Sequence, residues 1–211
     1  MPDTCVIFDL DGTLVDSEPL GNQALLDLLP DLDAPVDELV KRYRGLKLSL
    51  VLADVEDRLG RKLPERFAAD YRLKVAELFD EHLKPMPGVA DMLVNLDRPK
   101  CIASSGPPEK IAQALNASKL AHYFDGAFYS SYVIGSWKPS PDLFLHAAQD
   151  MGFHPDRCIV IEDSVVGVQA ALAAGMAVYH YAPPHAARID GNVQSFHDMT
   201  RLPDLLAASG R

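Results

Sequence analysis

A short apolar run near the start of the chain leads directly into a pair of aspartates. Residues 5–8 (Cys-Val-Ile-Phe) are apolar, and residues 9–13 read Asp-Leu-Asp-Gly-Thr. An apolar run of this length that ends in a turn predicts a buried strand. Reactive groups of open α/β sheets lie just beyond the carboxyl ends of such strands. The sequence therefore predicts a reactive edge at Asp9 and Asp11, and the D-x-D-G-T pattern should arise by chance only about once in a thousand chains of this length.

Strand-like and helical segments alternate through most of the rest of the chain. Four further strand-like runs occupy residues 100–104, 126–129, 158–161 and 177–180. Helical patterns lie between them at residues 107–117, 140–152 and 165–174, the last two with Ser140 and Ser164 as expected N-caps. This alternation predicts an α/β fold with a doubly wound parallel sheet.

Residues 16–85 depart from the alternation because their patterns are helical throughout. Helices are expected at residues 20–29, 36–43, 48–59 and 64–82. The joins at residues 15–17 and 84–88 are short, and the second is rich in Pro and Gly, as hinged linkers are. We therefore expect a helical cap domain, residues 16–85, inserted into a core domain of residues 1–15 and 86–211.

Composition excludes several classes of partner. The 211 residues carry a formal charge of −10, which argues against binding to nucleic acid or to an anionic membrane. The three cysteines lie in apolar runs, and neither an export signal nor an apolar run of about 18 residues is present. We expect a cytoplasmic protein, a monomer or weak homo-oligomer, whose partner is a small metabolite rather than a nucleic acid or a membrane.

Polar groups follow three of the strand-like runs. Asp9 and Asp11 follow the first, Ser104 ends the second, and Glu162 and Asp163 follow the fourth. Carboxyl ends of parallel strands share one edge, so these groups should meet in one crevice. Lys138, which precedes the helical pattern at 140–152, can reach the same edge.

Charge suggests the role of each group. A carboxylate that attacks a phosphoryl dianion needs a divalent cation, and oxygen ligands suit Mg²⁺. The expected Mg²⁺ ligands are Asp9, Asp163 and the backbone carbonyl of Asp11, with Glu162 acting directly or through water. Lys138 would neutralise both nucleophile and phosphate, and the Ser104 hydroxyl would bind a phosphate oxygen.

In order and spacing, these four motifs resemble those of the haloacid dehalogenase (HAD) superfamily of aspartate-based phosphotransferases. The resemblance covers essentially the whole chain and implies a Rossmann-like core with a helical cap. It implies that Asp9 forms an aspartyl-phosphate and that Asp11 protonates the leaving alcohol and then activates water. Gly12 and Thr13 would shape the turn beneath the phosphate.

Within the superfamily, the chain resembles the branch of sugar-phosphate phosphatases and β-phosphoglucomutases. Leu48 stands where the mutases carry an arginine for a second phosphate, and residues 104–108 lack the mutase S-x-S-K-N pattern. These departures favour a phosphatase for a sugar or sugar-acid phosphate such as 6-phosphogluconate. Expected substrate contacts, including two cations for a carboxylate, are Gly12, Thr13, Glu18, Arg44, Lys47, Ser105 and Gly106.

Three other functions stay open at this stage. A β-phosphoglucomutase-type phosphotransferase would use the same nucleophile. A phosphonatase could use Lys47 as a Schiff base, although Asp11 argues against it. A non-catalytic binding protein of the same fold would show no metal-dependent phosphate release.

Overall fold

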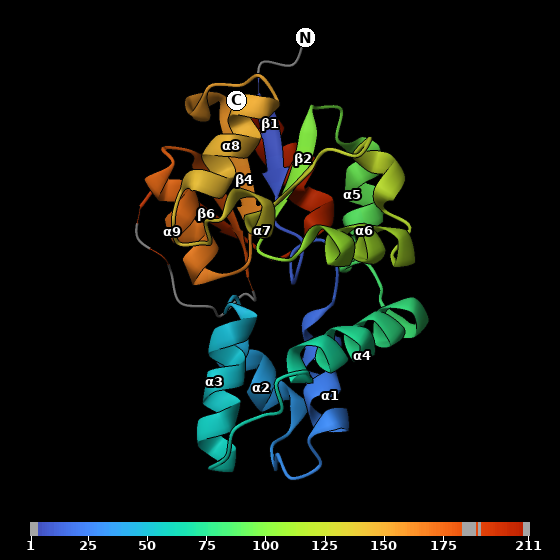
Figure 1. Ribbon diagram of the computed structural model, residues 1–211. Helices are drawn as coiled ribbons and strands as arrows, with labels where there is room; N and C mark the ends of the chain where they lie inside the picture. Colours follow the sequence, from blue (N-terminus) through green and yellow to red (C-terminus); the bar gives the residue numbers. More distant parts are fainter. Residues whose placement is uncertain (1–3, 183–188, 190, 209–211) are drawn as a thin grey trace.

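The computed structural model describes residues 4–182, 189 and 191–208 and contains one parallel sheet. Its strands run in the order β3-β2-β1-β4-β5-β6 (Figure 1). Their bounds are Cys5–Phe8 (β1), Lys100–Ser104 (β2), Phe128–Ser130 (β3), Cys158–Glu162 (β4), Ala177–Tyr181 (β5) and Val193–Phe196 (β6). The predicted α/β fold with a doubly wound parallel sheet is confirmed, and β6 is an additional strand that the sequence analysis did not predict.

The order of the strands places a crevice beside β1. The register pairs Phe8 of β1 with Ile102 of β2 on one side and with Ile161 of β4 on the other. The chain therefore leaves β1 in one direction and returns on its other side, which makes a topological switch point. Asp9 follows β1 and Asp163 follows β4, so the two lie at this switch point.

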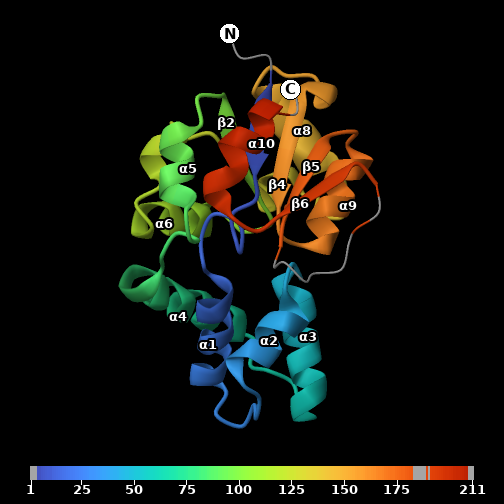
Figure 2. The same ribbon diagram turned by 180° about the vertical axis from the view of Figure 1, so that it is seen from behind.

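Strand β1 is buried on both faces because its side chains alternate between two apolar cores. Val6 and Phe8 pack in one core, and Cys5 and Ile7 in the other. Residues of α5 (Val89–Asn95), α6 (Pro108–Ala117) and α10 (Leu202–Ala208) join the first core, and residues of α8 (Asp142–Asp150) and α9 (Val165–Ala173) join the second (Figures 1 and 2).

Four helices form a separate unit beyond the carboxyl ends of the strands (Figure 1). They are α1 (Glu18–Leu28), α2 (Val36–Tyr43), α3 (Leu48–Leu59) and α4 (Phe67–His82). Leu25, Leu39, Val55 and Phe67 contribute to an apolar cluster of their own. The expected bounds of α2 and α3 match, whereas α1 starts at Glu18 and α4 only at Phe67. We call residues 18–82 the helical insert.

The two chain segments that join the insert to the sheet run side by side. Val15 and Pro85 form an antiparallel bridge, and the Asp16 amide donates a 3.0 Å hydrogen bond to the Lys84 carbonyl. The Met86 amide donates to the Leu14 carbonyl at 2.9 Å. A pair of short, hydrogen-bonded segments therefore connects the two parts.

Local capping agrees with the sequence at one helix and differs at another. Ser164 is the N-cap of α9, where its hydroxyl accepts a hydrogen bond from the Gly167 amide. Ser140 is not the N-cap of α8, because Pro141 occupies that position and the Ser140 hydroxyl donates to Asp142 instead. The short helices α5, α7 (Ser131–Ile134) and α10 were not predicted. Among the described residues, no helix has both the length and the apolarity that crossing a bilayer requires.

Candidate active site

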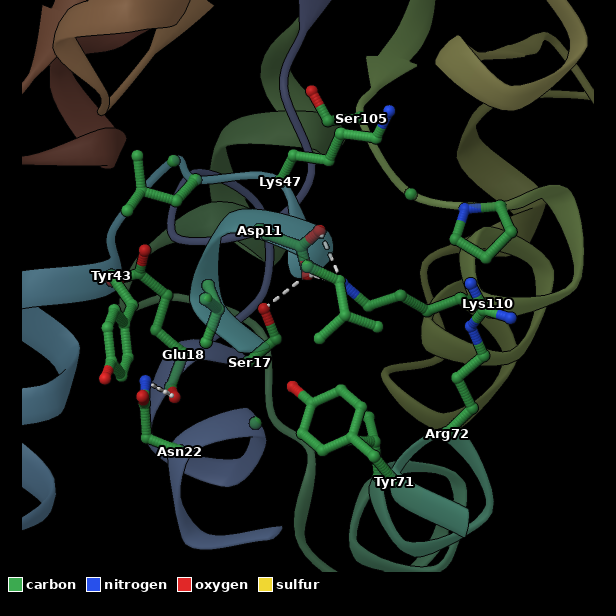
Figure 3. A pocket seen from close by; sticks show the side chains of 18 of the residues that line it. Asp11, Ser17, Glu18, Asn22, Tyr43, Lys47, Tyr71, Arg72, Ser105 and Lys110 are labelled. Atoms are coloured by element: carbon green, nitrogen blue, oxygen red, sulfur yellow. Dashed lines mark hydrogen bonds and ion pairs between the residues drawn. The ribbon is translucent and has the colours of Figure 1, made fainter. Parts of the chain in front are cut away.

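A cavity of about 590 Å³ lies between the carboxyl edge of the sheet and the helical insert. The sheet side contributes Asp9, Asp11, Lys138, Glu162 and Asp163 to its lining, and the insert contributes Glu18, Arg44, Lys47, Tyr71 and Arg72. Figure 3 shows Glu18, Asn22 and Tyr43 on one side of the cavity and Arg72 and Lys110 on the other, with Asp11 between them. The volume suits a small metabolite.

Asp9 and Glu162 share a buried lysine. The Nζ atom of Lys138 lies 2.5 Å from Asp9 Oδ1 and 2.7 Å from Glu162 Oε1. Burial raises the pKa of Asp9 to about 8, although the charge of Lys138 opposes the shift. Burial alone would lower the pKa of Lys138, but the two carboxylates outweigh it and raise that pKa above its usual range. The ammonium therefore stays charged beside Asp9.

Glu162 is fully engaged by hydrogen bonds, and this positions Lys138. Its Oε2 atom accepts bonds from the Ser164 amide at 2.7 Å and from the Ser164 hydroxyl at 2.9 Å. A Cβ atom at Gly167 would lie 1.8 Å from Glu162 Oε1, so only glycine leaves room for the carboxylate. The structure thus places Glu162 under the start of α9, pointing to Lys138.

Asp163 faces the turn that follows β1. The Thr13 hydroxyl donates to Asp163 Oδ1 at 3.0 Å. Gly12 has a φ of +81°, and a Cβ atom there would lie 2.5 Å from Asp163 Oδ2. Burial and the charges of Glu162 and Asp9 hold the pKa of Asp163 well above its usual range. Gly12 thus allows the close approach of two buried acidic segments.

Asp11 has a cationic partner that sequence reasoning missed. Lys110 Nζ lies 2.8 and 2.7 Å from the two carboxylate oxygens of Asp11, and the Ser17 hydroxyl donates to Asp11 at 2.6 Å (Figure 3). Burial alone would raise the pKa of Asp11, but Lys110 and Ser17 lower it. Lys110 stands in the first turn of α6, where a positive charge is unfavourable beside the helix dipole. That unfavourable position was the available signal for an anionic partner.

The loop after β2 reaches the cavity through Ser105 and Gly106 rather than through Ser104. Ser104 is fully buried, and its hydroxyl accepts a 3.1 Å hydrogen bond from the Gly106 amide. The Ser130 hydroxyl donates to the Gly106 carbonyl at 2.6 Å. Ser105 and Gly106 line the cavity. In this structure Ser104 shapes the loop, and its predicted phosphate contact stays a prediction.

The predicted cations of the insert, Arg44 and Lys47, have different surroundings. Arg44 Nε lies 2.9 Å from Glu18 Oε2 and 3.8 Å from Asp163 Oδ2. Lys47 Nζ lies 3.6 Å from the centre of the Trp137 ring. Arg72 of α4 also lines the cavity and was missed, because an exposed arginine in a helix carries no signal in the sequence. Gln113, Tyr71, Tyr132 and Asn22 are further lining residues that were not predicted.

The donors at the sheet edge suit Mg²⁺. Asp9 and Asp163 supply two buried carboxylates at the switch point. Burial, and to a smaller extent the charges of neighbouring carboxylates, raise the pKa of each, and a bound cation would favour the charged form of both. Among the residues that the structure describes, no group of three or more His, Cys, Asp or Glu side chains is arranged to hold a metal. Mg²⁺ keeps several waters and needs only one or two protein carboxylates, so Asp9 and Asp163 fit it.

Comparisons with known proteins agree with this geometry. The sequence model of the haloacid dehalogenase-like hydrolases matches residues 4–175. The 6-phosphogluconate phosphatase of Escherichia coli is 36% identical over 210 residues, which cover 97% of this chain and 95% of that protein. The fructose-1-phosphate phosphatase of the same species is 32% identical over 174 residues, which cover 81% and 92%.

A solved structure extends the match to the whole fold. A conserved haloacid dehalogenase-like protein from Agrobacterium tumefaciens superimposes with a TM-score of 0.84 at 32% identity and covers 99% of both chains. The family match covers strands β1 to β4, the insert and all four motifs. The chain belongs to the haloacid dehalogenase-like hydrolases.

Proposed function

We propose that this hydrolase is a Mg²⁺-dependent phosphatase that acts on a small sugar or sugar-acid phosphate through an aspartyl-phosphate intermediate. The observation that carries the proposal is the buried Asp9 side chain, which contacts Lys138 and lines the cavity together with Asp163. A carboxylate in this position is protected from water and beside a fixed positive charge. Both conditions favour attack on a phosphorus atom.

The residues divide the reaction between them. Asp9 attacks phosphorus and expels the substrate alcohol, and Lys138 balances the negative charge on the nucleophile and on the phosphoryl oxygens. Asp11 donates the proton that the leaving alkoxide takes up, and then accepts a proton from the water that hydrolyses the aspartyl-phosphate. The backbone amide and the hydroxyl of Ser105, which lines the cavity, offer donors for phosphoryl oxygens.

Mg²⁺ held by Asp9, Asp163 and the Asp11 carbonyl would neutralise the phosphate and so lower the repulsion between two anions. The helical insert, within residues 16–85, would act as a cap. Its closure over the sheet edge excludes water while Asp9 reacts, and the paired joins at Val15 and Pro85 form the hinge.

Two lines of support favour a 6-phosphogluconate-like substrate. The relatives named above are phosphatases of sugar or sugar-acid phosphates. The wall of the cavity carries Leu48, an apolar side chain that cannot grip a second phosphate as a mutase must. The cations of the insert, in contrast, offer a site for a carboxylate.

The test is phosphate release from a panel that contains 6-phosphogluconate, fructose 1-phosphate and both glucose phosphates, with Mg²⁺ and with EDTA. We expect a preference for 6-phosphogluconate, loss of activity with EDTA, and no activity in Asp9→Asn, which should fold normally. Equal, weak rates across the panel would contradict the substrate but keep the mechanism. Conversion of one glucose phosphate into the other would support the mutase, and full activity of Asp9→Asn would exclude Asp9 as the nucleophile.

A further inference from the structure

Two of the five cations that line the cavity differ from the other three in their partners. Lys138, Lys110 and Arg44 each contact a carboxylate of the cavity wall. Lys47 and Arg72 form no ion pair with any carboxylate among residues 4–182, 189 and 191–208. Each instead lies beside an aromatic ring that belongs to the part of the chain outside the helical insert. Two positive charges therefore line the cavity without a neutralising anion.

Two aromatic residues near the catalytic lysine hold these cations in place. Lys47 Nζ lies 3.6 Å from the centre of the Trp137 ring, and the Arg72 guanidinium carbon lies 5.8 Å from the centre of the Tyr132 ring. Arg72 Nη2 also lies 3.4 Å from the Tyr132 hydroxyl. The two rings pack edge to face, with centres 5.4 Å apart, and Trp137 directly precedes Lys138. The cations therefore lie beside neighbouring rings at a fixed place relative to Asp9.

A cation on an aromatic face keeps N–H groups that can bind an anion. The attraction of a ring is modest at an accessible site, whereas a charge-assisted hydrogen bond to a carboxylate is stronger and directional. In Figure 3 the Lys47 side chain runs toward the right along the upper part of the view, and Arg72 lies at the lower right beside Lys110. An anionic group that reaches the part of the cavity beside the neighbouring rings of Trp137 and Tyr132 could contact both cations without breaking an existing ion pair.

The acidic residues of the cavity make this location selective. Glu18, Glu109, Asp9 and Asp11 also line the cavity. Glu18, Asp11 and Asp9 are each already paired with a cation, so a second negative charge on a phosphate ester finds no unpaired positive charge beside them. A polyol phosphate, whose end opposite the phosphate is uncharged, gains little from the two cations that lack an anion.

We infer that Lys47 and Arg72, supported by Trp137 and Tyr132, form the subsite for a carboxylate at the far end of the substrate, so the preferred substrates are phosphate esters of sugar acids. This inference rests on the proposed phosphatase function and refines it. It also replaces Arg44, which the sequence suggested, because Arg44 is already paired with Glu18 and lies beside Asp163.

The experiment compares two esters that differ at one carbon. 6-Phosphogluconate carries a carboxylate where sorbitol 6-phosphate carries a hydroxymethyl group. We expect wild-type kcat/KM to favour 6-phosphogluconate, and Arg72→Gln and Lys47→Met each to reduce the ratio of the two kcat/KM values about tenfold, mainly through KM. Arg72→Lys should retain part of the preference because it keeps the charge.

The matched control is Arg66→Gln, which removes an exposed arginine from the start of the same helix and should leave the ratio unchanged. A wild-type enzyme that hydrolyses both esters equally well would overturn the carboxylate subsite alone. So would Lys47 and Arg72 variants that lose the same factor on both esters, since that result indicates a structural role. Absence of phosphate release from either ester would overturn the phosphatase proposal and this inference together.

Discussion

The side chain of Asp11 is fixed from two directions. Lys110 contacts both carboxylate oxygens, and Ser17, directly before the helical insert, donates to one of them. Lys110 belongs to α6, and its Nζ atom lies 5.8 Å from the centre of the Phe79 ring on α4 of the insert. The ammonium thus sits between the core and the insert and holds Asp11 toward the cavity. In the proposed mechanism Lys110 orients Asp11, because free rotation of the Asp11 side chain would misplace the proton that we propose it transfers.

Replacing Lys110 with methionine should therefore reduce kcat by about tenfold or more and change KM much less. The reason is that Asp11 loses its fixed orientation, whereas the groups that bind the substrate are unchanged. Steady-state rates on the preferred ester measure both constants. Lys41→Met, an exposed substitution on α2 outside the cavity, is the control and should change neither. A higher KM with unchanged kcat would show instead that Lys110 contacts the substrate.

At the scale of elements, the start of α9 positions Lys138, and through it the proposed nucleophile Asp9, by means of Glu162. Ser164 caps the helix and also donates to Glu162, and Glu162 in turn accepts a bond from Lys138. Gly167, in the first turn of α9, leaves the space that the Glu162 carboxylate fills. Within a helix, Gly→Ala is ordinarily stabilising by about 0.5–1 kcal/mol. Here the added methyl group would overlap Glu162, so the usual sign should reverse.

Gly167→Ala should lower thermal stability and reduce kcat/KM by about a hundredfold, because a displaced Glu162 no longer holds Lys138 beside Asp9. The control is Gly60→Ala at the end of α3. Gly60 has a φ of +62° and open space around it, so the variant should lose about 1 kcal/mol of stability and keep its activity. Activity assays and thermal unfolding of both variants decide the point, and normal activity in Gly167→Ala would contradict it.

The sequence predicted the elements that have strong local patterns and missed those that depend on packing. Strand β1 and helices α2 and α3 are continuous apolar or periodic runs, and their bounds followed from that pattern alone. Strand β6 is Val-Gln-Ser-Phe, a weak pattern that becomes a strand because β5 offers it an unpaired edge. The place of Arg72 in the cavity could likewise not be predicted from the sequence, because only the fold brings α4 close to Tyr132.

At the scale of the whole molecule, a chain with a formal charge of −10 concentrates three acidic side chains at the edge of its sheet. Asp9, Glu162 and Asp163 are all buried, and Lys138 contacts the first two of them. The raised pKa of Asp163, caused first by burial and then by its acidic neighbours, expresses an unfavourable charge in the folded protein. The buried acidic side chains therefore lower the stability of the fold, at the place where we propose that a divalent cation binds.

The effect of the Asp163 charge on stability can be measured by thermal unfolding. In EDTA, Asp163→Asn should be more stable than wild type by about 1 kcal/mol, or roughly 2–4 °C in Tm, because it removes one buried negative charge and keeps an oxygen for the Thr13 hydrogen bond. Mg²⁺ should raise the Tm of wild type, since an ion that binds only the folded state stabilises it, and should leave the variant nearly unchanged. The control is Asp97→Asn, which changes an exposed aspartate outside the helical insert and should respond to Mg²⁺ as wild type does. An equal Mg²⁺ response in Asp163→Asn and wild type would mean that the cation binds elsewhere, and Asp163 would then serve to hold Thr13 and the turn after β1 rather than a metal.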